Sequence, residues 1–477
     1  MTSSTHLASA RQVDTSRFTS VTTLEAWQRA LDERGLRATG SPEHQEYVAD
    51  LVSRLTALGI ETWTEAVPIR RWVPTAWSLA LTRADSDTDS ETPIPVVSYV
   101  SYSGATSWSG VTAPLSVEPR AGHIGVVQIP LVSMLASDLD SLDWDAPDQP
   151  VRPDGWNTEI PYERVWLSQD LMRTALDEHA AAGAAGLVLV VDTPADLIQN
   201  AYLLYDAVPR GIPALFVGRE AGRRLAEAHA AGATARLTLE AHTEDGETHN
   251  VVGLIPGASD ELIVLHSHTD GPNGLEDNGP EAILAMADYL KALGPDELPR
   301  GVLILLSTGH FAIEEAWGVE AFLARHAADL VPRIAAALSL EHLGALPRAE
   351  DYPADFDLPD HEFGCCFATP HRAIIDAVRG AMERAAVTDA LVLRPYVPDQ
   401  TGNSPDGTSW PGDGCPFWHT AGLPAANFIT GPGYTFNVEP TIDRIDIDAL
   451  RRQAIAFTEA VLELAHTPQA VLQAGVR

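Results

Sequence analysis

Histidine and carboxylate side chains follow three apolar segments of the sequence, and these side chains could hold a metal ion. The segments are 261–266, 302–307 and 334–340, and the residues that follow them include His268, Asp277, His310 and Glu341. Imidazole and carboxylate ligands together suit a divalent transition metal, zinc first. A single histidine in such a place is ordinary, so it is the repetition after three segments that indicates a metal site.

The elements that must position these residues form an α/β pattern. Short apolar runs typical of buried strands alternate with amphipathic stretches typical of helices. We expect strands at 261–266, 302–307, 334–340, 391–396 and 424–429, and helices at 280–293, 316–328, 371–386 and 446–466. This alternation predicts a mostly parallel sheet flanked by helices. Ligands bind outside the carboxyl ends of the strands in such sheets, so the histidines and carboxylates should share one rim.

Three residues of this rim are the predicted metal ligands: His268, Asp277 and Glu341. Asp270 comes two residues after His268, a spacing that suggests a carboxylate holding the other ring nitrogen of a ligand. Glu276, beside Asp277, would be the ligand instead if the register of its loop shifted.

Two further histidines lie next to the expected strand ends, and each has an ordinary alternative role. His266 would share the face of His268 by the alternation of a strand, as an extra ligand or as a donor behind one. His342 follows Glu341 and would point to the opposite face.

A long loop rich in Pro, Gly and Asp occupies residues 399–414. Loops of this length inside compact domains are usually functional or mobile, so this one either shapes substrate entry or is a surface loop. His419 follows it and is either a residue at the mouth of the site or an interface or core histidine.

The chain divides into segments with different patterns of apolar and polar residues. Residues 24–58 predict two helices, the second opened by Ser41 as N-cap with Pro and Glu after it. Residues 68–245 instead hold short apolar runs, acidic loops and helix–strand pairs, with strands expected at 186–191, 212–217 and 235–239. We therefore expect a catalytic domain built from 20–67 and 246–477, with 68–245 inserted as a lid or substrate domain.

The composition limits the classes of partner. Lys and Arg total 31 against 66 Asp and Glu, a formal net charge of −35. Such a surface repels nucleic acid and anionic lipid, so no nucleic-acid or membrane partner is expected. The 3 cysteines cannot make a disulfide framework. The first residues contain no apolar run typical of a signal peptide, and a cytoplasmic location is expected.

The chain resembles the family of co-catalytic zinc aminopeptidases and glutamate carboxypeptidases. The stretch 261–279, ELIVLHSHTDGPNGLEDNG, resembles that family's strand followed by His-x-Asp and Asp-Asn-Gly. The resemblance continues at 37–41, 301–323, 340–344, 421–425 and 441–446. The segment 68–245 is similar to the α+β protease-associated domain often inserted in such enzymes. The resemblance thus covers nearly the whole chain.

This resemblance implies a fold and a set of ligands. The family binds two zinc ions through five protein ligands. His268 matches the first ligand, Asp277 matches the carboxylate that bridges the metals, and Glu341 stands where the family usually has Asp. Asp270 matches the residue that orients the first histidine.

The second half of the family's site departs from the pattern. The family has adjacent glutamates after the second strand, whereas this chain has His310 there and Glu314-Glu315 out of register. Residues 434–437 contain no histidine where the family has its last ligand. We therefore expect one divalent metal, zinc first with manganese or iron as alternatives. His310 would be the general base, with Glu314 as the alternative.

These expectations point to a metal-dependent hydrolase that resembles zinc aminopeptidases and cleaves an amide or peptide bond in a small substrate. Two alternatives stay open at this stage. One is a two-zinc aminopeptidase in which His310 or His419 replaces a missing ligand, and the other is a non-catalytic binding or regulatory protein on a peptidase scaffold. The substrate would be a small neutral or cationic molecule or a short peptide, and the resemblance leaves a homodimer open.

Overall fold

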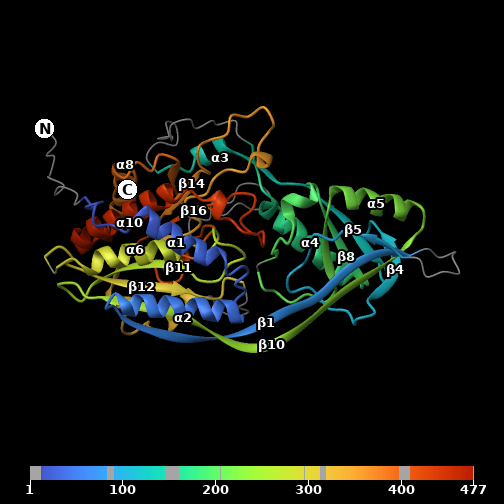
Figure 1. Ribbon diagram of the computed structural model, residues 1–477, viewed down its shortest axis with the longest axis horizontal. Helices are drawn as coiled ribbons and strands as arrows, with labels where there is room; N and C mark the ends of the chain where they lie inside the picture. Colours follow the sequence, from blue (N-terminus) through green and yellow to red (C-terminus); the bar gives the residue numbers. More distant parts are fainter. Residues whose placement is uncertain are drawn as a thin grey trace.

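A computed structural model of the chain describes residues 12–82, 91–144, 161–204, 206–294, 296–311, 318–396 and 409–475. It shows two lobes joined by a pair of very long strands (Figure 1). The larger lobe carries the predicted site residues. None of the described helices is long and apolar enough to cross a membrane.

The larger lobe is built on a mostly parallel sheet. Its strands are β11 (Leu262–His268), β12 (Gly301–Ser307), β13 (Ile334–Leu340), β14 (Gly364–Ala368), β15 (Ala390–Leu393) and β16 (Ala425–Thr430). They lie in the order β15-β14-β16-β13-β11-β12, and only β14 against β16 is antiparallel among these neighbours. The α/β fold predicted from the sequence is confirmed, and β13 has the predicted bounds.

Helices cover both faces of this sheet. The helices α1 (Val21–Asp32), α2 (Pro42–Ala57), α6 (Gly279–Lys291), α8 (Arg372–Arg384) and α10 (Ile447–His466) pack together on one face. The other face carries α7 (Gly318–Arg325) and α9 (Pro416–His419). Ser41 caps α2 as expected, since its side chain accepts a hydrogen bond from His44 N–H.

The alternation of β11 decides which side chains face the functional rim. Ile263 and Leu265 pack into the core formed with α6 and α10, whereas Val264 packs into the core formed with α7 and α9. His266 and His268 therefore share the α7 face with Val264.

The smaller lobe has its own sheet and helices. Its strands are β3 (Ser98–Tyr99), β4 (Val111–Ser116), β5 (Ile124–Ile129), β8 (Gly186–Val191) and β9 (Ala214–Gly218), with α4 (Gln169–Ala181) and α5 (Arg219–Ala230) beside them. Shorter elements are β2 (Thr92–Ile94), β6 (Ser133–Leu135), α3 (Ala136–Asp140), β7 (Pro161–Glu163) and the 3₁₀ turn η1 (Val165–Ser168). The last short helix, α11 (Gln469–Leu472), packs instead against α8 of the larger lobe. The predicted strand at 186–191 has the observed bounds of β8.

Two 22-residue strands connect the lobes, and the sequence did not predict their length. Strands β1 (Glu61–Thr82) and β10 (Thr234–Ile255) pair antiparallel along almost their entire length. Of this ribbon, the apolar pattern of the sequence predicts only a strand at residues 235–239. Much of β1 is exposed and contains Pro68 and Pro74, so it lacks the apolar alternation of a buried strand. Pro68 lies opposite Glu247, so the chain leaves and re-enters the larger lobe at adjacent points of the ribbon.

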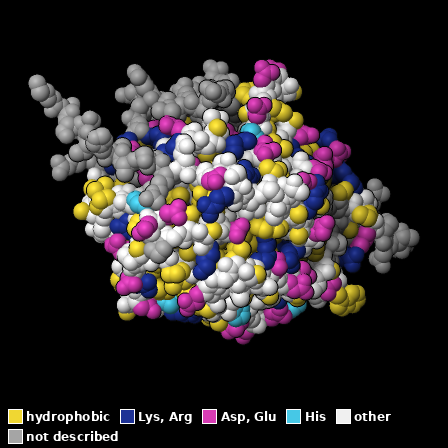
Figure 2. Space-filling model, turned by 60° about the vertical axis from the view of Figure 1, so that its left-hand side comes forward, with side chains coloured by type: hydrophobic (Ala, Val, Ile, Leu, Met, Phe, Trp, Pro, Cys, Tyr) yellow, Lys and Arg dark blue, Asp and Glu magenta, His cyan; other side chains and the backbone are white. Residues whose placement is uncertain are grey.

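The acidic charge is spread over the surface. On the face shown in Figure 2, acidic side chains are scattered among basic and apolar ones rather than gathered in one place.

Candidate metal centre

The carboxyl ends of β11, β12 and β13 bring four polar residues to one rim. His268 is the last residue of β11, His310 follows β12, and Glu341 and His342 follow β13 directly. His268, Glu341 and His342 are buried, while the His310 side chain is 11% exposed. The rim predicted from the sequence is therefore present.

His342 does not point away from the site as strand alternation suggested. The strand β13 ends at Leu340, and His342 has a positive φ of 55°. This left-handed conformation is uncommon for a residue with a side chain, and it turns the backbone so that Glu341 and His342 both line the same cavity.

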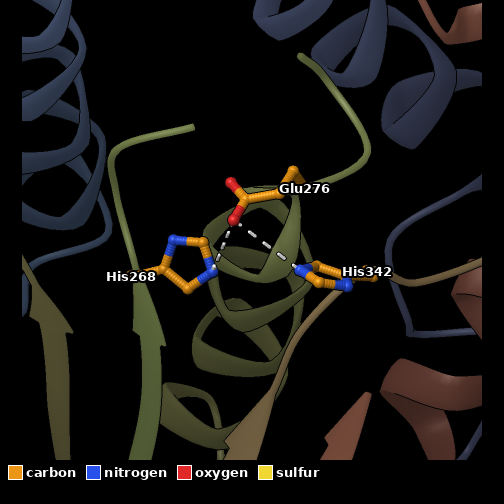
Figure 3. Close-up of side chains that lie close together, drawn as sticks. All are labelled: His268, Glu276 and His342. Carbon is orange, nitrogen blue, oxygen red and sulfur yellow. Dashed lines mark ion pairs between the residues drawn. The ribbon is translucent and has the colours of Figure 1, made fainter. Parts of the chain in front are cut away.

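Three imidazole rings converge on the carboxylate of Glu276 (Figure 3 shows two of them). Glu276 Oε1 lies 3.9 Å from His268 Nε2, 3.9 Å from His342 Nε2 and 3.0 Å from His310 Nε2. The rings of His268 and His310 stack with centroids 4.4 Å apart. Glu276 lies on the loop between β11 and α6 and is fully buried.

The second nitrogen of each ring is held by an oxygen acceptor. His268 Nδ1 bonds to the backbone carbonyl of Asp270 at 3.0 Å. His310 Nδ1 bonds to Asp413 Oδ1 at 2.8 Å, and His342 Nδ1 bonds to the carbonyl of Thr430 at 2.6 Å. A ring whose Nδ1 donates to an oxygen presents the lone pair of Nε2, the arrangement common in metal-binding histidines.

Several buried polar atoms of the cluster have no hydrogen-bond partner among the described residues. They are His268 Nε2, His342 Nε2, Glu276 Oε2 and Glu341 Oε2, whereas Glu276 Oε1 forms an ion pair with His310 Nε2 at 3.0 Å. Glu341 Oε2 lies 4.0 Å from His268 Nε2. Buried polar atoms left unpaired are costly, so these atoms together call for a bound cation.

The donor set fits a divalent transition metal. One ligand atom each from His268, Glu276 and His342 lies within 4.8 Å of the others. Tetrahedral zinc with nitrogen and oxygen ligands separates its ligand atoms by roughly 3.3 Å, so distances near 3.9 Å need only a small contraction.

The charges of the cluster depend on one another. Burial alone would lower the pKa of His310, but the carboxylates of Asp413 and Glu276 outweigh it and raise that pKa well above its usual value. Burial opposes ionisation of Asp413, yet the neighbouring His310 lowers the pKa of this carboxyl to about 2. His268 and His310 likewise lower the pKa of Glu276 against the effect of its burial. The site thus keeps Glu276 and Asp413 ionised.

Asp277 was predicted to be a metal ligand, but in the structure its carboxylate is paired with an arginine. Its two carboxylate oxygens receive Arg37 Nε at 2.6 Å and Arg37 Nη2 at 2.5 Å, and both residues are fully buried. Arg37 also donates to the carbonyl of Asn273 in the same loop. This pair leaves Glu276, one residue earlier, to face the histidines.

Asp270 holds His268 through its backbone rather than through its carboxylate. The carboxylate accepts hydrogen bonds from Thr39 Oγ1 and from Gly309 N–H, the latter at 3.1 Å. Asp270 therefore orients His268 by its carbonyl and ties the loop after β11 to the loop after β12.

The remaining predicted site residues lie apart from the cluster. Both nitrogens of His266 are bonded, at 2.9 Å each, to Ser339 Oγ and Ser307 Oγ inside the sheet. His419 is exposed at the end of α9 and bonds to Thr420 Oγ1. The alternative base Glu314 lies outside the described residues.

Asp413 is a member of the site that the sequence analysis did not single out. It belongs to the end of the long loop expected to shape substrate entry, and its N–H donates to Glu341 Oε1 at 2.9 Å. Only the loop itself was signalled, by its length and composition.

A cavity of about 400 Å³ opens onto the cluster between the two lobes. His310, Glu341, His342 and Asp413 lie on its wall. Most of the remaining wall is aromatic or aliphatic, including Tyr162 and Trp166 of the smaller lobe and Phe367 and Trp410 of the larger one. Apolar walls around a few polar groups are typical of small-molecule sites.

Comparison with solved structures assigns the fold. A peptidase M28 precursor from Shewanella amazonensis SB2B has a TM-score of 0.62 at 15% identity, over 96% of this chain and 99% of that one. An aminopeptidase from Aneurinibacillus sp. strain AM-1 has a TM-score of 0.58 at 16% identity, over 93% and 94%. A zinc aminopeptidase from Bacillus subtilis has 0.58 at 17%, over 92% and 94%. The chain has the zinc-aminopeptidase fold.

The sequence itself gives no such match. No protein-family model matches the chain, and no curated protein matches it in sequence. The structural similarity extends over nearly all of the chain, both lobes included, and it shows the fold alone. Any statement about chemistry therefore depends on the side chains of the metal centre.

Proposed function

We propose that the chain is a metal-dependent hydrolase that cleaves an amide or peptide bond in a small substrate at a single-metal centre. The observation that carries this proposal is the convergence of the unpaired His268 and His342 Nε2 atoms on the buried carboxylate of Glu276. These three residues would hold the metal, with Glu341 as a further ligand from the same rim. The fold shared with zinc aminopeptidases supports zinc.

One metal suits the centre better than two. A second group able to hold a metal consists of His268, His310 and Asp413. Both groups use His268, whose Nδ1 is already bonded to the carbonyl of Asp270. Since the one remaining ring nitrogen binds one metal, the two groups are alternative positions for a single ion.

The chain's own groups divide the work of hydrolysis. A divalent metal in this position supplies Lewis-acid polarisation of a carbonyl and lowers the pKa of water. His310 lines the cavity between the carboxylates of Asp413 and Glu276, which favour its protonated form. A divalent metal held by Glu276 would take up the charge of that carboxylate and favour the neutral ring, which would then take a proton from the attacking water and return it to the leaving amine. The apolar walls of the cavity would exclude bulk water.

The test is a metal count followed by a peptide assay. Protein stripped with a chelator and reloaded with zinc should bind one equivalent tightly and release free amine from short peptides only when loaded. His268→Ala should lose both the metal and the activity, and His419→Ala, an exposed histidine on α9, is the matched control that should lose neither. Two tightly bound equivalents would contradict the single-metal centre, and a loaded protein that cleaves no short peptide or amide would contradict the activity.

A further inference from the structure

Part of the cavity wall comes from the smaller lobe and carries polar groups that the proposed hydrolysis does not use. Trp166, in η1, and Gln169, the first residue of α4, both line the cavity. They sit within one turn of each other, and Gln169 Nε2 donates to the Trp166 carbonyl at 3.2 Å. This bond fixes the Gln169 side chain against the backbone of Trp166, and we call the two residues the pair.

Each member of the pair has a buried polar atom left over. Trp166 Nε1–H, a donor, and Gln169 Oε1, an acceptor, have no hydrogen-bond partner among the residues that the structure describes. Gln169 is only 3% exposed. Buried polar groups are nearly always paired in folded proteins, so these two indicate a missing partner.

The pair is held against the segment that supports the metal centre. Tyr162 Oη donates to the carbonyl of Gly431, and a Cβ on Gly431 would lie 2.6 Å from Trp166 Cζ2. The residue before it, Thr430, accepts the Nδ1 hydrogen bond of His342. The smaller lobe therefore packs directly behind His342, a ligand of the proposed metal centre, and the pair lines the same cavity as this histidine.

One N–H donor and one carbonyl acceptor on the same cavity wall complement an amide group. We propose that Trp166 and Gln169 form a subsite that binds a neutral amide of the substrate, its oxygen on the indole N–H and its N–H on the Gln169 carbonyl. A carboxylate would face the Gln169 oxygen, and a hydrocarbon would leave both atoms unpaired. The neighbouring Asp170 is already paired with Arg173 on the same wall, so the choice depends on Trp166 and Gln169 themselves. The inference rests on the proposed function in taking this cavity as the substrate site.

The amide could belong to a side chain or to the peptide backbone, and two sets of peptides separate these sources. In the first set, Xaa is Gln, Glu or the similarly sized Met in the tripeptides Leu-Xaa-Ala and Xaa-Leu-Ala. If the subsite binds a side-chain amide, kcat/KM for the Gln peptide should exceed that for the Met peptide about tenfold or more at one of the two positions. The Glu peptide should have the lowest kcat/KM. The second set replaces the non-scissile backbone amide by an ester. If the subsite binds a backbone amide, kcat/KM should fall by a similar factor in this second set and show no such preference in the first.

The variants Gln169→Met and Trp166→Phe should remove whichever preference the wild type shows, bringing the ratio to within about twofold. Leu167→Met is the matched control, because Leu167 lines the same wall without a polar side-chain atom. Equal rates across both peptide sets, or a preference that survives in both variants, would overturn the subsite. Thermal melting of each variant checks that it folds.

Calorimetry on the zinc-loaded protein separates failure of the subsite from failure of the proposed function. If no peptide is cleaved but the wild type binds the amide-bearing peptides more tightly and both variants do not, the subsite stands and the hydrolase proposal falls. Cleavage without any amide preference leaves the hydrolase proposal standing and overturns the subsite.

Discussion

Two histidines two residues apart on the same strand show how burial alone fails to mark a functional site. His266 and His268 are both fully buried and lie on the same face of β11. The sheet supplies a hydroxyl to each nitrogen of His266, and burial lowers its pKa to about 3. His268 lies where the strand ends, and one of its nitrogens has no partner among the described residues.

An unbonded second ring nitrogen therefore indicates a candidate ligand only where a carboxylate faces it, because His179 on α4 also has an unpaired Nε2 but belongs to no cluster of possible ligands among the described residues. His44 belongs with His266, since its Nδ1 accepts from Gly40 N–H and its Nε2 bonds to Thr269 Oγ1. His342 belongs with His268, because its Nδ1 is held by Thr430 and its Nε2 faces Glu276.

The strongest test of this distinction between the histidines removes the carboxylate that the rim histidines face. Glu276→Gln keeps the size of the side chain but loses the charge, and we expect the zinc affinity to fall at least about 100-fold, with activity lost. Removal of groups that merely support ligands already costs about 10–100-fold. Competition with a chromophoric chelator measures the affinity.

Asp277→Asn is the matched control, because it changes the neighbouring carboxylate that Arg37 holds. It leaves a buried guanidinium without its charged partner, so it should cost stability, about 3–5 kcal/mol, while the folded protein keeps its zinc affinity. Loss of zinc in Asp277→Asn with normal binding in Glu276→Gln would restore the ligand expected from the sequence.

The second prediction concerns the histidine of the rim that is paired with a carboxylate. His310→Gln should lower kcat by about 10²–10⁴-fold, the usual contribution of a general base, while one equivalent of zinc is still bound. Asp413→Asn should lower kcat less, because it removes only the group that bonds to His310 Nδ1. If either variant loses its zinc, His310 is a ligand at the alternative position rather than a base.

The sequence was sufficient for most elements of the larger lobe but not for the loops between them. Apolar runs such as 334–340 identified buried strands, because a strand covered on both faces must be continuously apolar. The choice between Glu276 and Asp277 depends on Arg37, which lies 240 residues away from its partner Asp277. No local pattern shows which of two adjacent carboxylates a distant guanidinium will take.

The same limit applies to His342 and Asp413. Alternation places His342 on the wrong face, and only the left-handed backbone just beyond β13 corrects this. Asp413 reaches His310 through a tertiary contact across 103 residues, which no local pattern of the sequence shows. The long β1–β10 ribbon was missed because its stability comes from pairing between distant segments rather than from local propensity.

The smallest expected effect tests the structural side of the comparison through His44. Burial lowers the pKa of His44 to about 4, from a usual value near 6.5, so the folded protein keeps this ring neutral. The unfolded chain takes up a proton below about pH 6.5. The contribution of His44 to stability is therefore complete above that pH and is lost as the pH falls from 6.5 towards 4, by about 1.4 kcal/mol per pH unit.

Replacing His44 by Asn should flatten the dependence of unfolding free energy on pH within this window. It should also lower stability at pH 7 by about 1–3 kcal/mol, since Gly40 N–H and Thr269 Oγ1 lose their partner. Urea unfolding between pH 4.5 and 7.5 measures both effects, and His419→Asn, which changes an exposed histidine, should alter neither. Zinc affinity at pH 7.5 should stay within about twofold of the wild type, because His44 supports the loop after β11 without facing Glu276. A His44 variant that folds normally but loses zinc would show that satisfied ring nitrogens do not separate structural histidines from those of the metal centre.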